Sequence, residues 1–68
     1  MDTLLNTEMM NLMSRVDMGT VKTSAQFDSA LVGMADNYGS EVTAESYLEM
    51  LRHCSPRAQE KISRLAGR

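Results

Sequence analysis

The residues most able to do covalent chemistry in this chain are His53 and Cys54, which are adjacent. A thiol beside an imidazole base can act as a nucleophile only when the two side chains face one another. Neighbours on a helix point about 100° apart, so we interpret Cys54 as a core residue. Glu41, Glu45 and Glu49 recur every four residues, which is typical of a solvated helix face. One cysteine and one histidine also make a poor ligand set for zinc, so we predict no enzyme activity, no metal and no cofactor.

A second group of residues could recognise charge. The C-terminal segment carries a basic stripe with spacings of four, three and four, made of Arg57, Lys61, Arg64 and Arg68. On a helix these side chains would lie within roughly 60° of one another. Residues 1–51 hold two basic and eight acidic side chains, a net charge of −6, whereas residues 52–68 hold five basic and one acidic, a net charge of +4. The two parts of the chain are therefore opposite in charge.

Three interpretations of the basic stripe compete. Cations near the end of a helix are favourable to its dipole, and exposed helix faces are commonly charged. Alternatively, the stripe meets an acidic surface on a second copy or on another protein, where it would steer association and fix register. The third interpretation is contact with a phosphate backbone, which the net charge of −6 on the rest of the chain opposes.

The nucleic-acid hypothesis has one structural argument. Two expected helices joined at Ser55 and Pro56 resemble a helix-turn-helix, and Arg57, Gln59 and Lys61 near the start of the second helix could contact base edges. Such a turn often contains glycine, however, and consecutive helices occur in any helical bundle.

Capping residues indicate where helices begin and end. Three glycines follow apolar-periodic segments, as helix stops do: Gly19, Gly39 and Gly67. The segment from Thr23 to Gln26 matches a capping box and predicts a helix start near Ser24. Ser55 followed by Pro56 matches an N-cap with proline in the first turn, so the preceding helix should end near Cys54.

Apolar residues step by three and four throughout, and no segment alternates as a half-buried strand would. We predict helices near residues 3–17, 24–38, 43–54 and 56–66. The third helix is expected to bury one stripe, made of Ala44, Tyr47, Leu48, Leu51 and Cys54. Residues 1–68 are thus predicted to form one all-α domain, a compact bundle of three to four short helices joined by short loops.

The first helix has more apolar side chains than one core needs. It offers a stripe for burial, made of Leu5, Met9, Leu12, Met13 and Val16, while Leu4, Met10 and Met18 point elsewhere on the helical wheel. A domain this small usually needs a disulfide, a metal or a partner copy for stability. Since one cysteine cannot form an internal disulfide, we predict a homodimer that buries the first helix.

These features together favour a small, non-enzymatic protein–protein interaction module, such as a regulatory adaptor or an inhibitor of a larger assembly. The lone thiol and the lack of a signal-like or membrane-spanning stretch favour the cytoplasm and no membrane partner. The predicted contact residues are Leu4, Met10, Met18, Arg57, Lys61, Arg64 and Arg68. The alternatives are a nucleic-acid-binding transcriptional regulator that uses the last helix, and an accessory structural subunit of a phage or secretion assembly.

Overall fold

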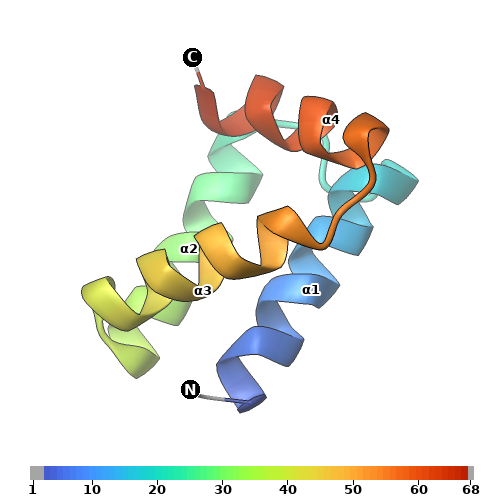
Figure 1. The fold of residues 1–68 in the computed structure, drawn as a ribbon. Helices are drawn as coiled ribbons and strands as arrows, with labels where there is room; N and C mark the ends of the chain where they lie inside the picture. The colour runs from blue at the N-terminus through green and yellow to red at the C-terminus, as the bar shows by residue number, and fades with distance from the viewer. Residues whose placement is uncertain (1–2, 68) are drawn as a thin grey trace.

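The helix boundaries follow the capping signals closely. A computed structural model describes residues 3–67 and contains α1 (Thr3–Met18), α2 (Ser24–Tyr38), α3 (Ser40–Arg52) and α4 (Pro56–Gly67) (Figure 1). The chain is all-helical, as predicted, and its connections are short. The expected bounds of the third helix were wrong at both ends: α3 begins at Ser40 and ends at Arg52. The earlier start arises because Gly39, with φ +100°, closes α2 and also precedes the first residue of α3.

The predicted glycine stop after α1 is confirmed. Gly19 has φ +84°, a left-handed conformation that glycine adopts without strain. Its N–H donates to Val16 O at 3.2 Å, and the Thr20 N–H donates to Arg15 O at 2.8 Å. This Schellman motif ends the helix and turns the chain back towards α2.

The predicted capping box of α2 is also confirmed. The Gln26 N–H donates to Thr23 Oγ1 at 3.1 Å, and Gln26 Oε1 accepts from the N–H groups of Thr23 and Lys22 at 3.3 and 2.8 Å. One residue further on, Ser24 Oγ donates to Leu65 O at 2.7 Å, which ties the start of α2 to the end of α4.

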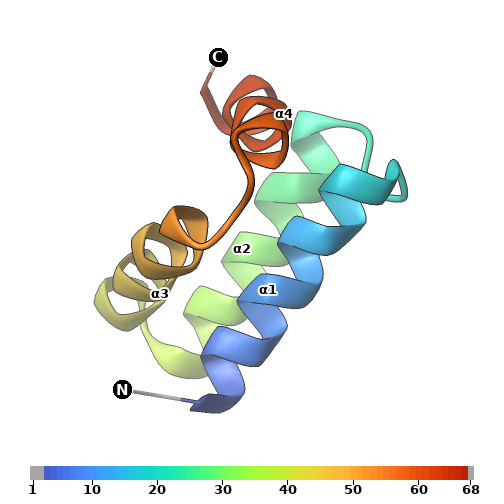
Figure 2. The same cartoon turned by 45° about the vertical axis from the view of Figure 1, so that its right-hand side comes forward.

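The helices pack in two layers. In Figure 2, α1 and α2 run antiparallel side by side, and α3 and α4 lie across one face of this pair. The core between the layers consists of Leu5, Met9, Leu12, Met13, Val16, Phe27, Met34 and Ile62. The stripe expected to be buried in the first helix is therefore buried within a single copy.

The expected inward face of the third helix was wrong in part. Thr43 and Ser46 are the buried residues of α3, whereas Ala44 is exposed and Leu48 keeps 62% of its accessible surface. Two contacts fix this rotation. The Tyr47 ring packs edge-on against Phe27 with centroids 6.2 Å apart, and Ser46 Oγ donates to Asn6 Oδ1 at 2.6 Å. Because Ser46 faces inwards, Leu48 lies about 200° further around the helix and faces outwards.

Candidate partner-binding site

The basic stripe of α4 divides according to what each side chain contacts. Lys61 Nζ donates to the backbone oxygen of Asp17 at 2.8 Å and lies 3.6 Å from Asp17 Oδ1. Arg64 Nη2 donates to Glu60 Oε1 at 3.0 Å, and both side chains are mostly exposed. Arg57 is exposed, and Arg68 lies outside the described residues. Lys61 therefore joins α4 to the end of α1.

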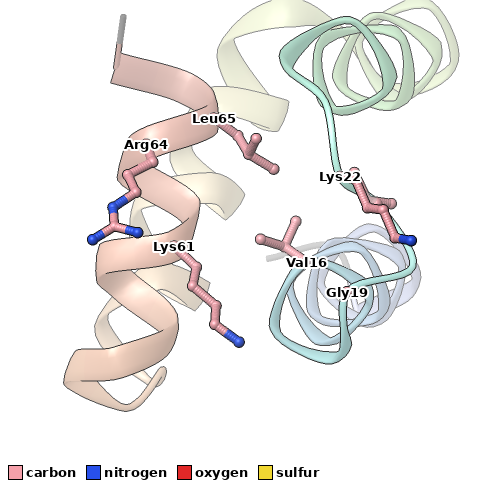
Figure 3. A pocket seen from close by; sticks show the side chains of 7 residues that line it. Val16, Gly19, Lys22, Lys61, Arg64 and Leu65 are labelled. Atoms are coloured by element: carbon pink, nitrogen blue, oxygen red, sulfur yellow. The ribbon is translucent and has the colours of Figure 1, made fainter.

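An apolar pocket of about 260 Å³ opens beside this junction, between α4 and the α1–α2 connection (Figure 3). Val16, Val21 and Leu65 form its apolar floor. The rest of its lining consists of Gly19 and three basic residues, Lys22, Lys61 and Arg64. In Figure 3 the side chains of Val16 and Leu65 project into the gap, while the Arg64 guanidinium turns away from Val16. We call this the basic-edged pocket.

The local sequence explains how the basic-edged pocket is built. The Schellman motif at Gly19 brings Val21 back over the end of α1, since the Val21 N–H also donates to Arg15 O at 3.2 Å. The capping box holds the backbone of Lys22 through Gln26. Leu65 is placed by the bond from Ser24 to its carbonyl. The Schellman motif, the capping box and the hydrogen bond from Ser24 to Leu65 therefore surround the basic-edged pocket.

The charges around the pocket are unevenly neutralised. Asp17 partly compensates Lys61, and Glu60 partly compensates Arg64. Within residues 3–67 the Lys22 ammonium forms no salt bridge. Exposed pairs of this kind are weak, so Arg64 can exchange Glu60 for an incoming carboxylate at small cost. The site can thus accept an apolar group flanked by negative charge.

The size of the pocket limits what it can hold. Cofactor and small-ligand sites usually occupy about 300–1,000 Å³ and bury most of the ligand, whereas this pocket has about 260 Å³ and is open. A single large apolar side chain fits that space better. Among residues 3–67 no cluster of three or more histidine, cysteine or carboxylate side chains could hold a metal ion.

The structure separates the three apolar contact residues predicted in the first helix. Leu4 and Met18 are 67% and 77% exposed, but fourteen helical residues place them about 21 Å apart along the axis. Met10 is half-buried and packs against the core. Only Met18 lies near the basic-edged pocket, directly before Gly19.

The sequence interpretation missed Lys22, Val21 and Leu65 as site residues. The α1–α2 connection and α4 are about 40 positions apart, and no periodicity relates residues across such a distance. One signal was present, because Lys22 is one of only two basic residues in the first 51.

His53 and Cys54 do not form a facing pair. His53 Nε2 lies 3.3 Å from Glu49 Oε2 in an exposed position, whereas Cys54 Sγ lies 3.5 Å from Met13 Sδ. Burial, and then the nearby charge of Asp17, raise the pKa of the Cys54 thiol. Hydrogen bonds from Arg52 and then His53 lower the pKa of Glu49. The absence of enzyme activity stays a prediction.

Two of the three residues considered for base contacts are used inside the protein. Gln59 Nε2 donates to Leu51 O at 2.9 Å and to Cys54 O at 3.2 Å, so it caps the end of α3. Lys61 is held by Asp17, which leaves Arg57 exposed in the first turn of α4. Nucleic-acid binding stays an alternative prediction, and Arg57 is the one of these three side chains that it could use.

No protein-family model, curated protein or solved structure matches this chain. None of the helices within residues 3–67 has the length and apolar character needed to span a bilayer.

Proposed function

We propose that this protein is a small, non-enzymatic interaction module that binds a partner protein through the basic-edged pocket. The observation that carries the proposal is the composition of this pocket, in which Val16, Val21 and Leu65 form an apolar floor beside Lys22, Lys61 and Arg64. A partner segment that presents one large apolar side chain with carboxylates beside it would satisfy both features. An adaptor or inhibitor acting on a larger assembly would work in this way.

The two features have different roles in binding. Burial of the partner's apolar side chain contributes about 25 cal/mol for each Å² removed from water. The cations accelerate encounter and set orientation, and their effect weakens with salt. Met18, which is 77% exposed and precedes the pocket, adds flexible apolar contact area beside the opening. The single, half-buried thiol of Cys54 is consistent with the proposed cytoplasmic location.

Titration with a synthetic acidic helical peptide that carries one leucine tests the proposal. Amide chemical shifts should move around Val16, Val21 and Leu65, and affinity should fall as salt rises. The substitution Lys22→Glu should weaken binding at least tenfold. Arg15→Glu makes the same charge change outside the basic-edged pocket, so it is the matched control. Equal weakening by both variants would indicate non-specific attraction and refute the assigned site.

A duplex DNA titration belongs in the same experiment. Binding of DNA that weakens steeply with salt and depends on Arg57 would favour the alternative regulator function. Since Gln59 and Lys61 have partners inside the protein, we expect no such binding.

A further inference from the structure

The outer face of α3 has the chemistry that the basic-edged pocket accepts. Leu48 is 62% exposed, and Glu41 and Glu45 precede it by seven and three residues. At about 100° per residue, the three side chains lie within roughly 60° of one another on the helix. This face points away from Thr43 and Ser46, which are buried against the body of the protein. We call it the acidic leucine face.

The charges on the acidic leucine face are available to a partner. Among the described residues Glu41 and Glu45 form no salt bridge, and both are exposed. Arg52 continues the same side of the helix, but its guanidinium binds Glu49 at 2.6 Å, so the face keeps a negative charge. The Leu48 side chain is complementary to the apolar floor of the basic-edged pocket, and the two free carboxylates are complementary to the free ammonium of Lys22.

The two surfaces cannot meet within one copy. α3 is fixed on the body by the Phe27–Tyr47 ring contact and by the bond from Ser46 to Asn6, with its outer face directed away from its own core. The pocket lies at the junction of α4 with the end of α1 (Figure 3). Contact between the acidic leucine face and the pocket therefore requires a second molecule.

We propose that a second copy of this chain occupies the basic-edged pocket, with Leu48 of each copy inserted between Val16 and Leu65 of the other. Glu41 and Glu45 then face Lys22 and Arg64 across the interface. In a two-fold dimer both contacts form at once, because each copy supplies one pocket and one face. This inference rests on the proposed function of the pocket, and it moves the self-contact from the exposed apolar residues of the first helix to the outer face of α3 and the basic-edged pocket.

Reciprocal charge reversal is the decisive test. Wild-type protein should show a concentration-dependent monomer–dimer equilibrium in sedimentation velocity, weaker at 0.5 M than at 0.05 M salt. The double variant E41K/E45K and the double variant K22E/R64E should each be monomeric, because like charges then meet. An equimolar mixture of the two should dimerise, since every face then meets a pocket of opposite charge. Circular dichroism should show both variants folded, as the four side chains are exposed.

Several results would overturn the self-contact. These are a wild-type protein that stays monomeric at every concentration, variants that dimerise unchanged, or a mixture that fails to restore the dimer. A mass that keeps growing beyond two copies would overturn the two-fold arrangement. The variant Leu48→Asp gives an independent check, because it should abolish dimerisation and leave the pocket intact.

The peptide titration separates the two proposals. The acidic peptide could bind L48D with the expected chemical-shift changes while the wild-type protein is monomeric. In that case the proposed function of the pocket is supported and the proposed self-association is wrong. If the peptide does not bind L48D at the pocket, the proposed function itself fails.

Discussion

Replacing Thr43 by valine should stabilise the protein. Thr43 is 5% exposed, and within residues 3–67 its Oγ1 atom has no hydrogen-bond partner. A buried, unpaired hydroxyl costs about 1–3 kcal/mol, and valine fills the same volume without that group. We therefore expect the free energy of unfolding to rise by about 1–2 kcal/mol. In a domain of this length each kcal/mol raises Tm by about 4–8 °C.

Thermal and urea unfolding followed by circular dichroism would measure the effect. Ser46→Ala is the matched control on the same face, because it removes the hydrogen bond to Asn6 Oδ1 at 2.6 Å and should cost about 0.5–1.5 kcal/mol. Stabilisation by T43V together with destabilisation by S46A would confirm the rotation of α3. If T43V lowered Tm, the assignment of a buried, unpaired hydroxyl to Thr43 would be wrong.

Three further predictions concern the same fold. In urea unfolding of the monomer at low protein concentration, Leu48→Ala should cost about 1 kcal/mol or less, because Leu48 is 62% exposed in one copy, whereas a core leucine would cost about 2–5 kcal/mol. Met13→Asp should abolish helical circular dichroism at every concentration, since Met13 is 2% exposed within one copy and an unpaired charge would be buried there. Burial and the Cys54 charge raise the pKa of Tyr47, and burial raises the pKa of Cys54. As pH rises, the unfolded chain therefore loses these protons before the folded protein does. The free energy of unfolding should fall as pH rises above about 8.5.

Local signals were enough to predict most of the fold. The glycine stop at Gly19, the capping box from Thr23 to Gln26 and the proline at the start of α4 each act within a few residues, so the sequence reveals them directly. The apolar stripe of α1 was predicted residue by residue because it repeats at helical spacing along the whole of this helix.

The rotation of α3 could not be predicted in the same way. Its leucines and alanine form the better helical stripe, yet the structure buries Thr43 and Ser46. The deciding contacts are with Phe27 and Asn6, which lie about 20 and 40 residues away in sequence. In α3 the contacts of Ser46 and Tyr47 with other helices therefore override the local apolar pattern.

The candidate site was predicted only for the part that lies on one helix. Lys61 and Arg64 were identified from their spacing on α4. Lys22 and Val21 reach the same opening through the turn after α1, and this proximity exists only after folding. Sequence spacing therefore recovered the two basic residues on the α4 wall of the pocket, and it missed Leu65 and the opposite wall.

The corner at Gly39 leaves no slack between two helices, because one residue ends α2 and also caps α3. Adding a single amino acid in the first turn of α3, with the Gly39 corner unchanged, would rotate every later side chain of the helix by about 100° relative to α2. The ring of Tyr47 would leave Phe27, and the carboxylates of Glu41 and Glu45 would swing to another side of the body. A one-codon insertion there would therefore change which side of α3 is exposed to solvent, although every existing side chain would be kept.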